Sequence, residues 1–265
     1  MMKLGTFAVE KPWGRTDLPA MFRADAGKRV GEIWFAPDDG SRQPLLVKYL
    51  FTSEALSVQV HPDDAQARES GLEGGKSECW YVLDAEPGAV IGMGVKKAVS
   101  REALRAASLD GSVEGMLDWV SVSSGDFFYI PAGTIHAIGA GLTLIEVQQN
   151  NDVTYRLYDY GRDRPLHLDE GIPVSDIQPY RPVATAPIKN GTRTLLDGSD
   201  QPFRLDMIAR GAGEHSLPER QCWLIPVCGS GTIDGESWVP GECWQGTGGS
   251  LFLAEPSDIL VASLP

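Results

Sequence analysis

Short runs of apolar residues, broken by clusters of Gly, Pro and Asp, recur along most of the chain. Most of these runs are rich in β-branched or aromatic residues, a composition typical of strands. The expected strands cover residues 45–50, 55–60, 78–83, 89–92, 127–130, 143–148, 203–209, 221–228 and 251–262. This pattern predicts an all-β protein with many turns.

One region departs from the strand pattern. Residues 100–107 contain good helix formers after Ser100, which can cap a helix N-terminus. Residues 112–118 resemble a second short helix capped by Ser112. We therefore expect a helical insertion over residues 99–118.

Prolines concentrate in residues 179–187, which predicts an extended linker. Strand-like runs lie on both sides of this segment. The chain is therefore expected to form a first domain over residues 1–180 and a smaller β-domain over residues 188–265.

The formal net charge of −13 makes the chain a poor partner for nucleic acid or an anionic membrane surface. A phosphorylated small molecule is still compatible, because a few local cations can hold one phosphate. No apolar run predicts a membrane span and the N-terminus does not resemble a signal peptide. The four cysteines include no C-x-x-C pair, which argues against a disulfide framework. These features predict a cytoplasmic protein.

The first segment with candidate chemistry is LSVQVHP, residues 56–62. Because side chains alternate across a strand, Ser57, Gln59 and His61 share one face while Val58 and Val60 take the other. A regular polar face predicts a polar space in front of it. The alternative is an edge strand with a wet face.

A second segment, GKSECWYV at residues 75–82, places Lys76, Glu78 and Trp80 on one face. A carboxylate in an apolar strand is expensive to bury unless it is paired or binds a metal. The alternative is an ordinary surface Lys–Glu pair.

A third segment has the spacing G-x5-P-x-G-x2-H and ends at His136. Its glycines and proline predict a tight turn between two strands that holds His136 in a fixed direction. A lone histidine is more often structural, but this spacing is the second signature motif of cupin barrels.

A fourth segment alternates Glu146 with apolar neighbours, and Asp152 and Arg156 follow it. Glu146 is therefore expected on one face of a strand. For Arg156, the alternative to a functional role is a salt bridge to Asp159 or Asp163.

Together these segments supply four candidate metal ligands, Gln59, His61, Glu78 and His136. Two imidazoles, a carboxylate and an amide oxygen suit Zn²⁺, and also Fe²⁺, Co²⁺ or Mn²⁺. The other histidines lack a comparable setting, and we interpret His167 as structural.

The same segments resemble type I phosphomannose isomerases, in particular the short bacterial form. The matching stretches are KPWG (11–14), GEIW (31–34), LSVQVHPDD (56–64), GKSECWY (75–81), GDFFYIPAGTIHA (125–137) and IEVQQNNDVTYRLYDYGR (145–162). They occur in family order over roughly the first 170 residues. As a set they are highly specific.

The resemblance implies a cupin (jelly-roll) barrel followed by a smaller, degenerate cupin-like domain that binds no metal. It implies one divalent ion, usually zinc, held by Gln59, His61, Glu78 and His136. The implied catalytic residues are Lys76, Glu146, Asp152 and Arg156, and the implied substrate contacts are Ser57, Lys76, Arg156 and Trp13.

The implied reaction interconverts mannose 6-phosphate and fructose 6-phosphate through a cis-enediol. Glu146 and Asp152 are the preferred acid–base groups, Lys76 could polarise an oxygen, and Arg156 could bind the phosphate or an anionic intermediate. The division of these roles stays open. We expect a monomer or a homodimer.

Two other classes of protein remain to be weighed. A cupin dioxygenase normally uses a ferrous site rich in histidine, whereas only two histidines are well placed here. A non-catalytic sugar-binding cupin would keep the fold but lose the acid–base groups, which this sequence retains. A bifunctional enzyme that also makes GDP-mannose is not expected, since no Gly-rich nucleotide-binding segment is recognised.

Overall fold

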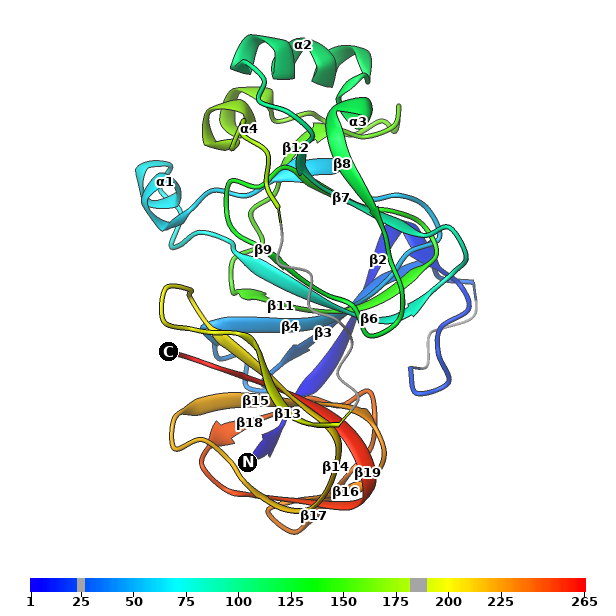
Figure 1. Ribbon diagram of the computed structural model, residues 1–265, viewed down its shortest axis with the longest axis vertical. Helices are drawn as coiled ribbons and strands as arrows, with labels where there is room; N and C mark the ends of the chain where they lie inside the picture. The colour runs from blue at the N-terminus through cyan, green and yellow to red at the C-terminus, as the bar shows by residue number, and fades with distance from the viewer. Residues whose placement is uncertain (23–26, 182–189) are drawn as a thin grey trace.

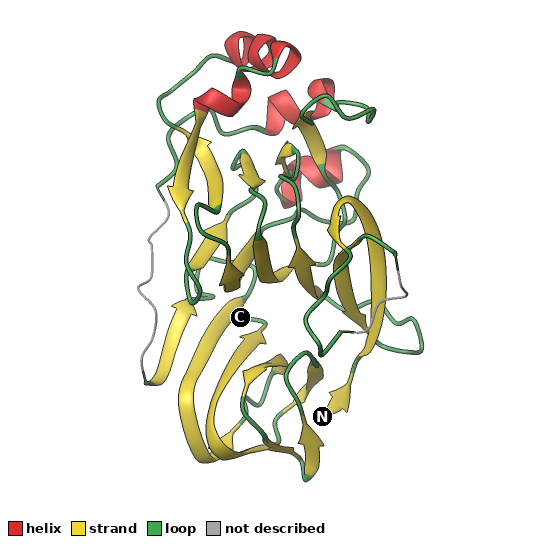
Figure 2. Cartoon of the chain, turned by 90° about the vertical axis from the view of Figure 1, so that its right-hand side faces the viewer, coloured by secondary structure: helices red, strands yellow, loops and turns green. Residues whose placement is uncertain are grey.

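The computed structural model describes residues 1–22, 27–181 and 190–265. Its strands form three antiparallel sheets, and four short helices gather at one end (Figure 1 and Figure 2). Within these residues, no helix is long and apolar enough to cross a membrane. The predicted all-β class is confirmed.

Two of the sheets face each other and form the barrel in the upper half of Figure 1. The six-stranded sheet has the order β2 (Gly5–Arg15), β3 (Val30–Ala36), β4 (Leu45–Phe51), β11 (Leu142–Gln149), β6 (Glu78–Ala85) and β9 (Phe127–Ile130). The five-stranded sheet has the order β12 (Tyr155–Tyr158), β5 (Val58–Val60), β10 (His136–Ile138), β7 (Val90–Val95) and β8 (Leu117–Ser121).

The third sheet forms the lower unit in Figure 1. Its main path is β1 (Met2–Lys3), β18 (Trp244–Thr247), β15 (Gln221–Cys228), β19 (Ser250–Ser263), β14 (Arg204–Ser216) and β13 (Gly191–Leu196). The hairpin of β16 (Gly231–Ile233) and β17 (Glu236–Trp238) pairs with β19. The first strand of the chain thus belongs to a sheet built mostly from the C-terminal part.

The central strands of the six-stranded sheet are buried on both faces, and β4 is buried at every position. Alternate residues such as Val47, Tyr49 and Ile145 pack toward the third sheet, against Phe203 and Leu260. Burying one such side chain contributes roughly 1.5–3 kcal/mol. The residues between them face the barrel interior. The alternation of side chains along each strand thus separates the residues that pack on the third sheet from those that face the barrel interior.

The helices are α1 (Asp64–Glu69), α2 (Arg101–Asp110), α3 (Val113–Met116) and α4 (Leu168–Val174). The Ser100 side chain accepts a hydrogen bond from Ala103 N at 3.1 Å, as predicted for a helix cap. The insertion ends earlier than expected, because residues 117–118 begin β8, which pairs with β7. Ser112 gives no cap hydrogen bond and instead donates to Asp110.

The predicted strands are otherwise present, with one shortened. Residues 55–57 lie outside β5, which begins at Val58. Most of the predicted linker, residues 182–187, lies outside the described residues. The division into domains 1–180 and 188–265 stays a prediction.

Candidate metal and active site

The four predicted metal ligands meet inside the barrel, and the neighbouring Val58 and Val60 of β5 pack outward against the helices. Three of them, His61, Glu78 and His136, are buried, and their ligand atoms lie within 4.8 Å of one another. Gln59 lies opposite His136 in the β5–β10 ladder, and its Nε2 is 3.2 Å from His136 Nε2. The wet-edge alternative for this strand is therefore wrong.

Both imidazoles are held by backbone carbonyls. Nδ1 of His61 lies 2.8 Å from Val153 O, and Nδ1 of His136 lies 2.9 Å from Thr134 O. Each Nδ1–H donates to its carbonyl, which leaves a lone pair on each Nε2. Burial and the nearby Lys76 charge lower the pKa of His61 to about 3, so this ring stays neutral.

These lone pairs converge on the Glu78 carboxylate. Its Oε1 is 3.2 Å from His136 Nε2, and its Oε2 is 3.4 Å from His61 Nε2. Acceptors facing acceptors at this distance repel unless a cation lies between them. Lys76 compensates the Oε2–His61 pair, so the pair formed by Oε1 and His136 is the one that needs a further cation. The donor set and its orientation therefore fit a divalent metal ion.

Gln59 fits this ion after one adjustment. Its Oε1 accepts from Ser57 Oγ at 3.1 Å, while its amide nitrogen points at His136. The two ends of an amide are assigned from the hydrogen-bond network. Turning the amide by half a rotation would aim Oε1 at the ion and let the nitrogen donate to Ser57.

Lys76 joins the metal-binding cluster to a second carboxylate. Its Nζ is 2.8 Å from Glu78 Oε2, 3.3 Å from His61 Nε2 and 3.7 Å from Glu146 Oε1. Lys76 and Glu78 are 3% and 1% exposed, so the alternative of a surface ion pair is wrong. Lys76 and Glu146 thus lie beside the candidate metal ligands.

Lys48 was not identified from the sequence. It is 2% exposed, and its Nζ lies 3.2 Å from Glu146 Oε1 and 5.4 Å from the centroid of the Trp34 ring. Glu32, also missed, accepts from Trp34 Nε1 at 2.7 Å and lies 3.3 Å from Lys11 Nζ. The available signal was a single lysine within the apolar run LLVKYLF.

Glu146 has the electrostatics of a proton-transfer group. Burial, aided by the negative charge of Glu78, raises its pKa to about 7 against the opposing charges of Lys48 and Lys76. Its Oε1 is buried and accepts no well-aligned hydrogen bond among the described residues. A carboxyl group with such a pKa can both accept and donate a proton near neutrality.

Arg156 lies opposite Gln59 in the β5–β12 ladder, so the two side chains share a face. Its Nη1 donates to Pro165 O at 2.7 Å, and its Nε is 3.9 Å from Asp159 Oδ2. The ion pair with Asp159, which was the alternative to a functional role for Arg156, is therefore present. Asp159 also holds Arg162 at 2.9 Å and Arg164 at 2.5 Å, so three guanidinium groups surround one carboxylate.

The remaining predicted site residues differ in position. Asp152 is exposed, and its charge helps to raise the pKa of Lys48, which puts it within electrostatic reach. Trp13 is 3% exposed and packs in the apolar cluster with Trp80, a position that gives no support for contact with substrate. His167 Nδ1 accepts from Arg156 N at 3.1 Å, in agreement with a structural role.

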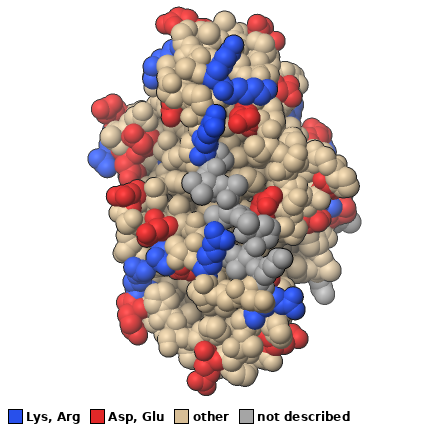
Figure 3. Space-filling view, viewed as in Figure 1, with Lys and Arg blue, Asp and Glu red and all other residues tan. Residues whose placement is uncertain are grey.

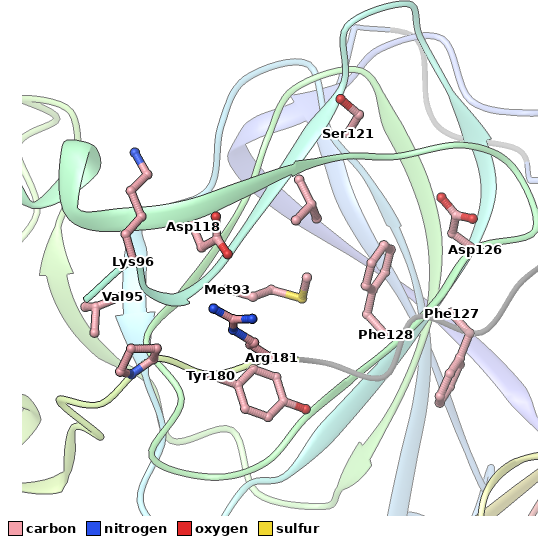
Figure 4. A pocket seen from close by; sticks show the side chains of 12 residues that line it. Met93, Val95, Lys96, Asp118, Ser121, Asp126, Phe127, Phe128, Tyr180 and Arg181 are labelled. Atoms are coloured by element: carbon pink, nitrogen blue, oxygen red, sulfur yellow. The ribbon is translucent and has the colours of Figure 1, made fainter. Parts of the chain in front are cut away.

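A separate cavity of about 380 Å³ opens between the edge strands β8 and β9 (Figure 4). Met93, Phe128 and Tyr180 form its apolar wall, with Arg181 and Asp118 among its charged groups. None of the predicted site residues lines it. Among the described lining residues, no buried polar atom lacks a partner, so nothing there indicates a specific ligand.

The charged side chains on one face of the molecule are mixed in sign. On the face shown in Figure 3, the described acidic and basic side chains are interspersed, without a broad basic area.

Known proteins resemble a large part of this chain, although no family model matches it. The chain is 39% identical over 225 residues to the probable mannose-6-phosphate isomerase GmuF of Bacillus subtilis, covering 78% of this chain and 71% of GmuF. It is 46% identical over 149 residues to the mannose-6-phosphate isomerase of Streptococcus mutans, covering 54% of this chain and 47% of that protein. The second match thus spans about half the length of the relative.

Solved structures of mannose 6-phosphate isomerases are similar to this chain over nearly its whole length. The crystal structure of mannose 6-phosphate isomerase from Bacillus subtilis matches with a TM-score of 0.80 and 26% identity, covering 99% of each chain. A zinc-bound mannose 6-phosphate isomerase matches with a TM-score of 0.73 at 14% identity, which supports the fold alone, over 99% of this chain and 98% of the other. The cupin fold expected from the sequence is confirmed, and the chain belongs to the mannose-6-phosphate isomerase family.

Proposed function

We propose that this protein is a metal-dependent aldose–ketose isomerase that interconverts mannose 6-phosphate and fructose 6-phosphate. The observation that carries the proposal is the buried cluster of His61, Glu78 and His136 joined through Lys76 to Glu146. The names of the matched relatives support the same substrate pair.

Zinc is the proposed ion, held by His61, His136, Glu78 and the reoriented amide of Gln59. Two imidazoles with oxygen ligands are a usual zinc set, and a matched structure of the family carries zinc. When bound, the ion would supply Lewis-acid stabilisation of negative charge on the sugar oxygens O1 and O2.

Glu146 is the proposed proton carrier. It takes the proton from C2 of open-chain mannose 6-phosphate and returns it to C1, while a hydroxyl proton moves between O2 and O1 through the cis-enediol. Lys48 and Lys76 hold the same carboxylate oxygen and place positive charge beside the reacting oxygens. Asp152 remains the second candidate for acid–base work.

The phosphate is proposed to bind near Arg156, Arg162 and Arg164. Three guanidinium groups face the buried Asp159 carboxylate, and Arg162 also lies 3.5 Å from the exposed Glu54, which still leaves net positive charge in a chain whose formal charge is −13. Burial and the neighbouring Arg164 charge lower the pKa of Arg156, as expected for crowded cations. A phosphate dianion would relieve this repulsion with charge-assisted hydrogen bonds. Ser57 stays a predicted substrate contact.

The test is a coupled assay with mannose 6-phosphate on the purified chain, before and after chelation and again after zinc is added back. We expect turnover that is lost on chelation and restored by zinc. Glucose 6-phosphate is the control, because it differs only in configuration at C2. Full activity after complete metal removal, or oxygen uptake without isomerisation, would contradict the proposal. The predicted cytoplasmic location and the monomeric or dimeric state remain predictions.

A further inference from the structure

Gln148 is a fully buried amide that lies opposite Glu78 in the β6–β11 ladder. Its side chain is therefore on the same face of the sheet as the metal-binding carboxylate. The proposed mechanism gives Gln148 no task. An apolar residue of similar size would fill the same space without burying a polar group.

The orientation of the Gln148 amide is fixed by the two carbonyls that accept hydrogen bonds from its nitrogen. Nε2 donates to Gln149 O at 2.9 Å and to Asn151 O at 2.8 Å, so both of its protons are used by carbonyls. Turning the amide over would place Oε1 against two carbonyl oxygens. Oε1 is buried and has no hydrogen-bond partner among the described residues.

The loop held in this way leads to a metal ligand. Asn151 N donates to Gln149 O at 2.7 Å, and Asn151 Oδ1 accepts from Val153 N at 3.2 Å. The carbonyl of Val153 then accepts the Nδ1–H of His61 at 2.8 Å. Three hydrogen bonds, joined through the covalent bonds of Asn151 and of Val153, thus form a continuous path from Gln148 to His61.

We propose that Gln148 is a positioning residue for the metal ligand His61. By fixing the loop between β11 and β12, it keeps the Val153 carbonyl where it selects the Nδ1–H tautomer and aims Nε2 at the ion. The proposal rests on the metal site described above. Groups that orient a ligand in this way typically change metal affinity 10–100-fold when removed.

The experiment measures zinc affinity of the full chain by competition with a chelating dye, for wild type and Gln148→Met. Asn151→Ala is a second variant, because it breaks the next link of the same path. Gln43→Met is the matched control, since it removes a side chain that accepts from Gln221 and Gln245, two residues of the third sheet. We expect 10–100-fold weaker zinc binding in the first two variants and wild-type binding in the control.

A comparison of double variants distinguishes an effect through the position of His61 from a general loss of structure. In a His61→Ala background, Gln148→Met should cause no further loss of zinc affinity, because the ligand through which it acts is gone. An equal loss with and without His61 would overturn the proposal, as would wild-type zinc affinity in Gln148→Met and Asn151→Ala.

The tautomer of His61 provides a readout without metal. In the metal-free wild type, ¹⁵N NMR should report a protonated Nδ1, and in Gln148→Met a mixture of tautomers. An unchanged tautomer would also count against the proposal. Failure of the wild type to bind zinc would instead remove the proposed metal site, so the two failures are distinguishable.

Discussion

Lys48 Nζ lies 3.2 Å from Glu146 Oε1, and each side chain is 3% exposed. Burial lowers the pKa of Lys48, but the negative charges of Glu146 and Glu32 outweigh it and raise this pKa above its ordinary value. Lys48 is therefore charged and dry, and it lies directly opposite Glu146 across the β4–β11 ladder.

Lys48→Met should reduce both stability and turnover. Removing one partner of a buried ion pair can cost up to about 3–5 kcal/mol in the free energy of unfolding. We expect a smaller loss here, because Lys76 stays 3.7 Å from Glu146 and the raised pKa of Glu146 lets it take up a proton. Urea unfolding and the coupled assay check the two effects. Lys96→Met, which removes an exposed lysine, should change neither. A fully active, fully stable Lys48→Met protein would contradict this account.

The raised pKa of Glu146 makes stability depend on pH. Its pKa is about 7 in the folded protein, against an ordinary value of 4.5 for the unfolded chain, so the folded protein binds this proton more tightly. The stabilising contribution is full below pH 4.5 and is lost as pH rises through 7.

Metal-free wild type should therefore lose roughly 2–3 kcal/mol of unfolding free energy relative to Glu146→Gln between pH 5 and pH 8. Urea titrations of both proteins at several pH values measure this difference. Other titrating groups are common to the two proteins and largely cancel. Parallel stability curves would show that Glu146 is ionised throughout.

His136→Ala should lose zinc and activity together, because it removes one ligand from a cluster whose atoms lie within 4.8 Å. Metal analysis after dialysis and the coupled assay give the two readouts. His215→Ala, in β14 of the third sheet, is the matched control and should keep both. Zinc retained at wild-type level in His136→Ala would place the ion elsewhere.

Arg164→Ala should raise KM for mannose 6-phosphate while leaving zinc content unchanged. A charge-assisted hydrogen bond contributes about 1.5–3 kcal/mol, which corresponds to roughly 10–100-fold in KM. Arg105→Ala removes an arginine that pairs with the exposed Asp169 and should have no effect on KM. If kcat falls instead and KM is unchanged, Arg164 does not bind the phosphate.

Sequence reasoning identified the candidate metal ligands, which the structure brings together, because two local rules sufficed. Strand alternation places Gln59 and His61 on one face, and the turn before His136 fixes where that side chain points. Neither rule requires knowledge of which strands are neighbours. The ladders then bring Gln59 opposite His136, which is the arrangement that the ligand set needs.

The residues that were missed depend on register, which local pattern does not contain. Lys48 matters because β4 pairs with β11 at Glu146, and Gln148 because β11 pairs with β6 at Glu78. Helix α4 was also missed, since it lacks a side-chain cap and contains Pro173. The strand pairing of β8 likewise overrode the predicted helix at residues 117–118.

The six-stranded sheet determines whether the chain can be shortened. Glu146 and Gln148 point into the barrel, whereas Val147 between them is in the core shared with the third sheet. Cutting the chain before β13 would leave that side of the active-site wall facing water. The sheet that carries Glu146 therefore depends on the C-terminal strands for its packing. A chain shortened in this way should lose the proposed metal site, although it still contains every proposed ligand.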